Sequence, residues 1–160
     1  MEVEKRRRVE KRCDDSSASE FNKEGQIKEI YLEDFMNHKK VLLTLGDKLN
    51  FITGENGAGK SAFVTALQVC LGGRSERSAR LSGLIREGSS GPAIVRITLS
   101  NCGSDAYNPE VYGTSISIER KIYSSGACRY TIYSAEMEVI NIKFSFNLFR
   151  NIIFLLFFSL

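Results

Sequence analysis

The chain has 160 residues, of which 42% are hydrophobic and 26% are charged, and its formal net charge is +3. This length and balance predict one globular domain with a modest core, and so small a net charge does not by itself indicate a nucleic-acid ligand. Four widely spaced cysteines and a single histidine argue against a zinc site and against a small disulfide scaffold. They favour a reducing compartment, either the cytosol or the nucleus.

Residues 1–22 are predicted to be a disordered basic leader, because they hold few apolar side chains that could offset the entropy of ordering. The positive charge gathers in residues 5–12. Such a cluster is equally consistent with a nuclear address and with a solvated run of charge. No apolar stretch follows it, so it does not read as a secretory signal.

Residues 23–136 are predicted to form the folded part. Three strands are expected in its first half, over residues 27–32, 41–45 and 49–53, and the third runs straight into a glycine-rich loop. A helix is expected over residues 60–71. Its apolar side chains lie on more than one face, which predicts a buried helix, and Gly72-Gly73 ends it.

A polar connection rich in arginine and serine follows over residues 74–91, with a short helix expected at 81–86. Three further strands are predicted, over residues 93–99, 115–123 and 127–133. In the first of them, alternate residues share one face: Ala93, Val95, Ile97 and Leu99. Residues 124–126 form the predicted hairpin turn between the last two.

Residues 137–160 form an atypical apolar tail. Its last apolar run begins after Asn151, which is too short for the roughly 20 residues of a membrane helix. The bias toward Phe, Ile, Leu, Asn and Lys is typical of translated non-coding sequence, so we expect a fragment with a read-through or foreign end. The alternative is a genuine buried strand or helix pair.

The glycine-rich loop has the spacing Gly-x-x-x-x-Gly-Lys-Ser, over the residues Gly54, Glu55, Asn56, Gly57, Ala58, Gly59, Lys60 and Ser61. Glycines let successive backbone N–H groups point inward at phosphate oxygens, and the start of the following helix favours anions. The lysine supplies a charge for the β- and γ-phosphates, and the serine hydroxyl binds Mg²⁺. The spacing therefore predicts a site for ATP with Mg²⁺, with Ser61 as the metal ligand.

Five segments together resemble the N-terminal head segment of the structural-maintenance-of-chromosomes (SMC) ATPases, and in particular its sixth eukaryotic branch. They are Asp34-Phe35-Met36-Asn37-His38, residues 50–57 entering the loop, residues 66–73 at the helix exit, Leu84-Ile85-Arg86-Glu87-Gly88, and residues 112–120. Asp34 stands where this family usually has Asn. The resemblance implies an α/β fold: the N-terminal half of an ABC/SMC-type phosphate-loop ATPase head, with an antiparallel β layer.

The resemblance implies a nuclear, chromosome-associated protein of DNA repair and recombination. The implied partners are the C-terminal half of an SMC head, the fifth SMC subunit, non-SMC subunits and DNA, and no membrane. In this family the Walker B aspartate, the catalytic glutamate and the signature motif belong to the C-terminal half. We therefore assign no catalytic residue here and expect ATP binding without efficient hydrolysis.

Several interpretations stay open at this stage. His38, expected in a loop between the first two strands, is either close to the nucleotide, with Lys39 or Lys40 toward phosphate, or simply exposed. One of Arg74, Arg77 and Arg80 faces nucleotide or DNA, or all three belong to a solvated loop. The rival functions are a RecF- or RecN-like ATPase, a phosphoryl transferase, an ABC transporter subunit, and a non-catalytic interaction fragment.

Overall fold

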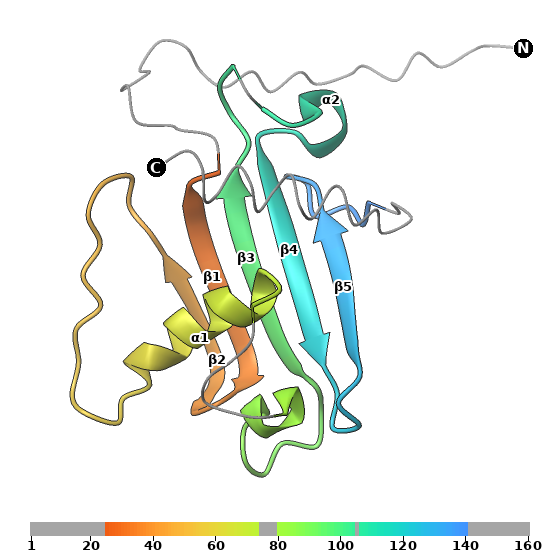
Figure 1. Ribbon diagram of the computed structural model, residues 1–160. Helices are drawn as coiled ribbons and strands as arrows, with labels where there is room; N and C mark the ends of the chain where they lie inside the picture. The colour runs from red at the N-terminus through yellow and green to blue at the C-terminus, as the bar shows by residue number, and fades with distance from the viewer. Residues whose placement is uncertain (1–24, 74–79, 105, 141–160) are drawn as a thin grey trace, which may run out of the picture.

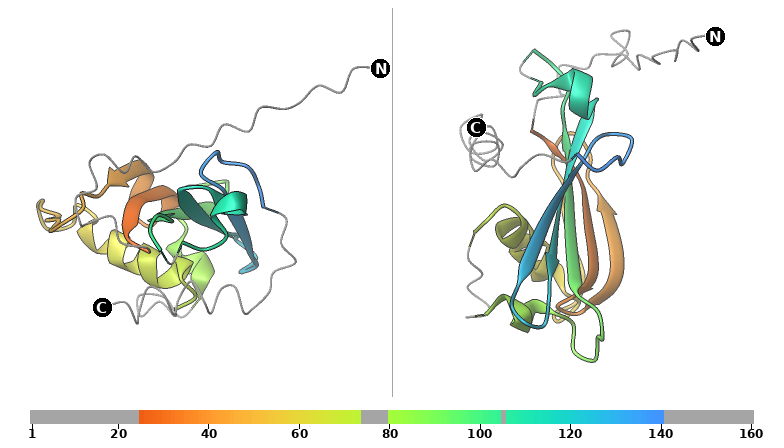
Figure 2. Two further views of the ribbon diagram at one scale, coloured as in Figure 1. Left: turned by 90° about the horizontal axis from the view of Figure 1, so that it is seen from above. Right: turned by 90° about the vertical axis from the view of Figure 1, so that its right-hand side faces the viewer.

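The structure is a computed structural model that describes residues 25–73, 80–104 and 106–140. A five-stranded antiparallel sheet with the order β2-β1-β3-β4-β5 carries one principal helix across one face (Figures 1 and 2). The strands are β1 Ile27–Phe35, β2 His38–Thr44, β3 Ala93–Ser100, β4 Ser115–Ile122 and β5 Cys128–Tyr133. The helices are α1 Lys60–Cys70, the 3₁₀ turn η2 Leu81–Leu84, and the four-residue α2 Pro109–Tyr112. Within these described residues, no helix has the length and apolar character needed to span a membrane.

The core lies between the sheet and α1. One row across the sheet joins Ile30, Ile97, Ile118 and Ile132 as register partners, and all four are buried. The alternation predicted for residues 93–99 is confirmed, because Ala93, Val95, Ile97 and Leu99 are all buried. The helix contributes buried side chains from two of its faces, as its sequence predicted: Ala62, Phe63, Thr65, Ala66, Val69 and Cys70.

The opposite face of the sheet is polar. At its centre the Glu119 side chain is only 3% exposed and accepts from Arg96 at 3.1 Å and from the Tyr133 hydroxyl at 3.1 Å. The Arg96 guanidinium lies 5.0 Å from the ring centre of Tyr31 and 5.6 Å from that of Tyr133. Burial, followed by the hydrogen bond to Glu33, raises the pKa of Tyr31 to about 12. Paired charged and aromatic side chains thus fill the centre of this face, while Leu42 of β2, the register partner of Tyr31, is exposed.

The C-terminal end of α1 is fastened to the sheet. Gly72, in the left-handed region, donates to Val69 O, and Gly73 N donates to Gln68 O at 2.7 Å, which is the Schellman pattern of helix ends. Arg120 Nη1 from β4 also donates to Val69 O at 2.6 Å. A cation beside these carbonyls is favourable because the last turn carries partial negative charge. Packing and side-chain donors therefore fix this end together.

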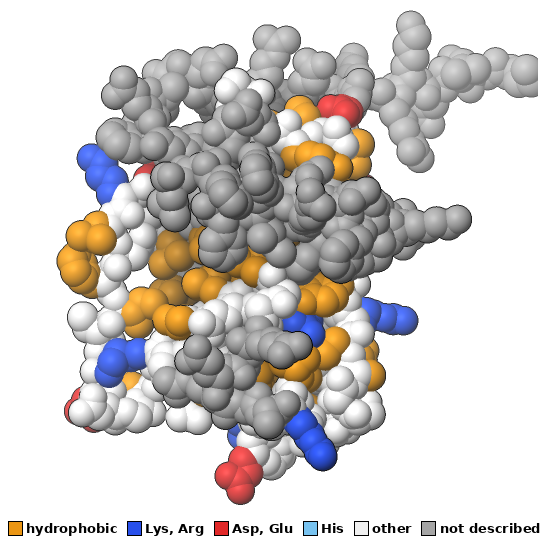
Figure 3. Space-filling model, in the orientation of Figure 1, with side chains coloured by type: hydrophobic (Ala, Val, Ile, Leu, Met, Phe, Trp, Pro, Cys, Tyr) orange, Lys and Arg blue, Asp and Glu red, His pale blue; other side chains and the backbone are white. Residues whose placement is uncertain are grey.

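The third predicted strand, over residues 49–53, is wrong. The segment forms no strand, and the loop after β2 extends away from the sheet (Figure 1). Its Leu49 and Phe51 are 76% and 80% exposed, and Ile52 is 42% exposed. Hydrophobic side chains are visible at this edge of the molecule (Figure 3). A strand needs a hydrogen-bonding neighbour, and none of the described strands lies beside this segment.

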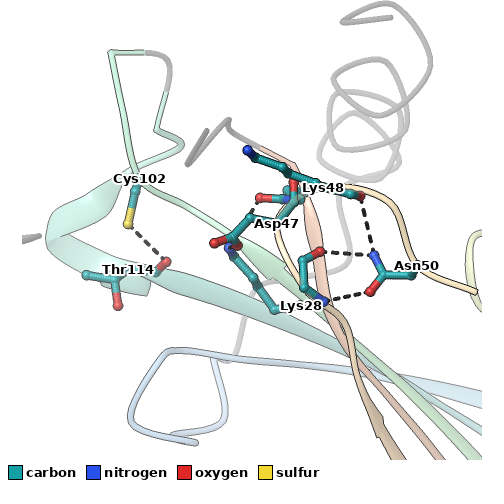
Figure 4. Close-up of polar contacts among 8 residues, drawn as sticks. Lys28, Asp47, Lys48, Asn50, Cys102 and Thr114 are labelled. Atoms are coloured by element: carbon teal, nitrogen blue, oxygen red, sulfur yellow. Dashed lines mark hydrogen bonds and ion pairs between the residues drawn. The ribbon is translucent and has the colours of Figure 1, made fainter. Parts of the chain in front are cut away.

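The start of that loop is nevertheless anchored (Figure 4). Lys28 Nζ of β1 lies 2.6 Å from Asp47 Oδ1, and the Asn50 side chain accepts from Gly46 N at 2.8 Å and donates to Gly46 O at 3.0 Å. These contacts close a tight turn at the end of β2. Of the exposed apolar residues, Leu49 thus lies within this turn, and Phe51 and Ile52 follow it.

Two smaller differences concern the sequence predictions. The short helix α2 was not predicted, because four residues are too few to show helical periodicity. Residues 134–140 fold back on β5, since Ser134 N donates to Glu138 O and Ile140 N donates to Ile132 O. The predicted leader, residues 74–79 and the tail beyond Ile140 lie outside the described residues.

Candidate phosphate-binding site

The loop that enters α1 has the backbone that its glycines predict. Gly57 and Gly59 have φ of +87° and +89°, a region that side-chain-bearing residues rarely adopt. Ala58 N donates to Glu55 O at 3.2 Å, which closes a turn inside the loop. Gly59 is the N-cap of α1, and no side chain caps the first turn of that helix. The first helical N–H groups are therefore available to an anion.

Lys60 is the first residue of α1, and its side chain folds back across the loop. Its Nζ donates to Gly54 O at 2.6 Å and to Glu55 O at 2.7 Å. An ammonium group has three N–H donors, so these two bonds leave one for a further acceptor. Lys60 thus stabilises the loop through two hydrogen bonds and also places a positive charge at the N-terminus of α1.

Ser61 follows in the same first turn and is half-buried. Its carbonyl accepts from the Thr65 hydroxyl at 3.1 Å, which ties it to the next turn. The combination of uncapped amides, an ammonium group and a hydroxyl fits a phosphate with a hard divalent cation. No cluster of three or more His, Cys, Asp or Glu able to hold a metal occurs among the described residues.

The sequence analysis expected His38 in a loop, but His38 is the first residue of β2. Its Nε2 lies 3.1 Å from Gly59 O, and its ring centre lies 5.3 Å from that of Phe63 on α1. The neighbouring Asn37 Nδ2 lies 3.5 Å from Gly57 O. His38, for which the sequence analysis left a place near the nucleotide open, therefore contacts the loop backbone together with Asn37.

Of the basic residues considered earlier, Lys39, Lys40 and Arg80 are among the described residues. Lys40 lies 6.0 Å from the ring centre of Tyr31, on the polar face of the sheet, and Lys39 is exposed. Arg80 is exposed and directly precedes η2. Arg74 and Arg77 lie outside the described residues. The structure thus brings residues 54–61 together with Asn37 and His38, whereas the side chain of Lys40 lies over Tyr31.

A second set of contacts joins the β1–β2 turn to the segment after η2. Met36 N donates to Leu84 O and Arg86 N donates to Asp34 O, each at 2.8 Å. Arg86 Nε also lies 2.8 Å from Asp34 Oδ1. The Arg86 hydrogen bond, followed by that from Ser89, lowers the pKa of Asp34. Sequence reasoning missed this link, although both segments were among the five that carried the resemblance.

Comparison with protein families gives one domain match. The model of the RecF/RecN/SMC N terminal domain matches residues 26–151. The match includes the whole described sheet and α1, and it reaches into the segment for which a foreign end was expected. The boundaries of the leader and the tail stay predictions.

Two curated relatives show how the chain compares with longer proteins. It is 39% identical over 125 residues to structural maintenance of chromosomes protein 6 of Schizosaccharomyces pombe, which is 76% of this chain and 11% of the relative. It is 44% identical over 123 residues to the protein of the same name from Takifugu rubripes, which is 74% of this chain and 11% of the relative. The chain thus spans about a tenth of their length.

Solved structures agree with this similarity. A structure from work on ATP-driven dimerization and DNA-stimulated activation of SMC ATPases has a TM-score of 0.65 and 26% identity, and covers 81% of this chain and 78% of that chain. A crystal structure of an Smc head bound to the C-winged helix domain of ScpA has a TM-score of 0.61 and 25% identity, and covers 81% of this chain and 40% of that chain.

Proposed function

The chain belongs to the RecF/RecN/SMC N-terminal domain family, and we propose that it binds ATP with Mg²⁺ as the N-terminal segment of an SMC ATPase head. Its fold is that of such a segment, with a phosphate-loop helix on an antiparallel sheet. Within the family it is similar to protein 6 of the SMC group from several eukaryotes. Because the chain spans about a tenth of those relatives, the activity of the whole protein is part of the proposal.

The observation that carries the proposal is the geometry at the start of α1. Two glycines with positive φ bend the chain into a helix whose first amides have no side-chain cap, and Lys60 lies across that bend. Backbone amides and an ammonium group together favour the triphosphate. In this proposal the Ser61 hydroxyl is the Mg²⁺ ligand, and residues 54–59 supply backbone contacts.

The exposed apolar residues suggest where the rest of a head docks. Leu49, Phe51 and Ile52 precede the loop and are exposed, and apolar side chains exposed in one segment are typical of an interaction surface. The C-terminal half of an SMC head is the partner that we propose for it. The proposed heterodimer with the fifth SMC subunit, and the contacts with non-SMC subunits and DNA, rest on sequence similarity alone.

A nuclear role in DNA repair and recombination is the broader proposal, and it is supported by the similarity to SMC protein 6. The family match favours an SMC head over a transferase or a transporter subunit. Low ATP turnover by this chain alone stays a prediction. A non-catalytic interaction fragment is the alternative that the exposed Leu49 and Phe51 support.

Isothermal titration calorimetry with Mg-ATP tests the proposal on the purified 160-residue chain, alone and coexpressed with the C-terminal head segment of the Schizosaccharomyces pombe relative. Wild type should bind. Lys60→Ala should bind about ten- to a hundredfold more weakly, since a charge-assisted hydrogen bond to phosphate is lost.

Lys48→Ala, at an exposed lysine of the preceding loop, is the matched control for loss of one positive charge and should bind as wild type does. Folding of every sample is checked by circular dichroism. If folded wild type shows no heat of Mg-ATP binding in either preparation, the proposed function is wrong.

A further inference from the structure

The imidazole ring of His38 occupies the space beside the last glycine of the phosphate loop. A Cβ placed on Gly59 would lie 2.5 Å from His38 Nε2 and 2.8 Å from Cε1, distances that real Cβ atoms do not show. The same ring packs against Phe63, whose side chain is 8% exposed. Gly59 is therefore required both by its φ of +89° and by the ring beside it.

The hydrogen bond between the two residues has a defined direction. The distance from His38 Nε2 to Gly59 O is 3.1 Å, and a carbonyl oxygen can only accept, so Nε2 carries the hydrogen. Gly59 O also accepts from Ala62 N at 2.9 Å. Two donors from different elements thus fix the direction of this carbonyl.

Fixing that carbonyl also fixes the next amide. The Gly59 C=O and the Lys60 N–H belong to one planar trans peptide unit, so they point in opposite directions. When Gly59 O points into α1 and toward His38, the Lys60 N–H points out of the helix toward the loop. That amide is one of the uncapped donors at the start of α1.

The residues that precede His38 are themselves held in place. Met36 N donates to Leu84 O, Arg86 pairs with Asp34, and Phe35 is fully buried. The β1–β2 turn before His38 is therefore bonded to residues 84–86, while Asn37 and His38 contact the phosphate loop. Because the β1–β2 turn is held in this way, the adjacent His38 side chain can orient the Gly59 carbonyl.

We propose that His38 is a positioning residue for the nucleotide phosphates: it orients the Gly59–Lys60 peptide and does not itself touch the ligand. This inference rests on the proposed ATP binding. It gives His38 a role that is separate from that of Lys60, which contributes charge. It also gives a reason for the contact between a residue of β2 and Gly59, which lies 21 positions further along the chain.

Two substitutions in the full 160-residue chain, prepared as for the calorimetry above, separate positioning from packing. His38→Phe keeps an aromatic ring against Phe63 but removes the donor, and should weaken Mg-ATP binding about three- to tenfold, as expected for one neutral hydrogen bond. His38→Gln restores an N–H donor and should recover most of the lost affinity. The ¹⁵N–¹H signal of the Lys60 amide should move in His38→Phe and return toward the wild-type position in His38→Gln.

The outcomes are distinct. If His38→Phe binds Mg-ATP as wild type does and leaves the Lys60 amide signal in place, the inference is overturned. A fall in melting temperature with unchanged affinity of the folded fraction also overturns it, because that result describes packing only. If wild type does not bind, the proposed function fails, while the Lys60 signal in the absence of nucleotide still tests the positioning.

A double-mutant cycle gives a second test if His38→Phe does not fold. Gly59→Ala is strained by its φ and by the ring, whereas in a His38→Ala background only the φ strain remains. Gly59→Ala should therefore lower the melting temperature less in that background than in wild type. Equal effects in the two backgrounds would contradict the contact on which the inference depends.

Discussion

The two ends of α1 contrast in how they are held. At the C-terminal end, Val69 and Cys70 are fully buried and Val69 O accepts from Arg120 at 2.6 Å. At the N-terminal end, residues 51–58 are exposed, and the side chains of Asn37 and His38 contact the loop backbone. One helix thus joins a packed region to an exposed loop, and its first backbone amides have no side-chain cap.

This contrast separates stability from ligand binding along a single helix. Burial of apolar side chains and the hydrogen bond from Arg120 to Val69 O contribute to the free energy of unfolding. The uncapped first turn contributes little to it. Substitutions near Val69 should therefore change stability, and substitutions near Lys60 should change affinity. The following experiments test that separation, from the largest expected effect to the smallest.

Ile97→Ala should lower the free energy of unfolding by about 2–5 kcal/mol, since it leaves a cavity at the centre of the core. Ile97 is fully buried on β3 between Ile30 and Ile118. Urea unfolding followed by circular dichroism measures the effect. A loss below about 1 kcal/mol would show that this sheet is not the stable part of the chain.

Arg120→Ala should cost about 1–3 kcal/mol of stability, because the buried Val69 carbonyl loses a charged donor. The Arg120 guanidinium also lies 4.8 Å from the ring centre of Tyr130, and this contact is lost as well. Arg129→Ala, on the exposed side of β5, is the control and should stay near wild type. Mg-ATP affinity of the folded protein should not change. An affinity loss as large as that of Lys60→Ala would contradict the separation of the two ends.

Alkaline pH should weaken the packed region. Burial raises the pKa of the Cys70 thiol from 9.0 to about 12 and that of the Tyr130 hydroxyl from 10.0 to about 12. Groups whose pKa is raised by folding stabilise the folded state fully below their unfolded pKa, and this contribution is lost as the pH rises toward the folded value. The free energy of unfolding should therefore fall between about pH 9 and pH 12.

Urea midpoints at pH 8, 9.5 and 11 measure this dependence. Cys70→Ala removes one of the titrating groups and should flatten the curve. Midpoints that do not change up to pH 11 would show that Cys70 and Tyr130 ionise as readily in the folded chain as in the unfolded one.

Phe51→Ser should have the smallest effect on unfolding, within about 0.5 kcal/mol, because the side chain is 80% exposed. It should instead reduce self-association of the isolated chain, which light scattering measures. It should also weaken capture of a C-terminal head segment if Phe51 belongs to that interface. A loss of more than 1 kcal/mol would place Phe51 in the packed region and remove the contrast drawn above.

Periodicity and turn chemistry were sufficient to predict most strands of the sheet. Alternation over residues 93–99 predicted β3, and the Gly-Lys-Ser spacing predicted both the loop and the helix that follows. These features succeed because they depend on the residues of one segment. The segment over residues 49–53 has the same apolar character and still forms no strand, since pairing depends on a neighbour that its own residues do not specify.

The support of the site was harder to predict for the same reason. The sequence analysis associated His38 with the nucleotide region through a resemblance, but nothing in its local pattern indicates a contact with Gly59, 21 positions away. The pair formed by Asp34 and Arg86 spans 52 positions. Such contacts arise from the packing of distant segments, so a single sequence does not reveal them.

The order of the strands has a consequence for the route by which the molecule forms. The β1–β2 hairpin and the β3–β4–β5 meander pair between sequence neighbours, whereas β1 ends at Phe35 and its other partner β3 begins only at Ala93. Closing so long a loop costs more entropy than closing a hairpin, and this favours late pairing of β1 with β3. The nucleotide loop and its helix lie inside that interval, so during synthesis they emerge well before the strand that completes the sheet beneath them.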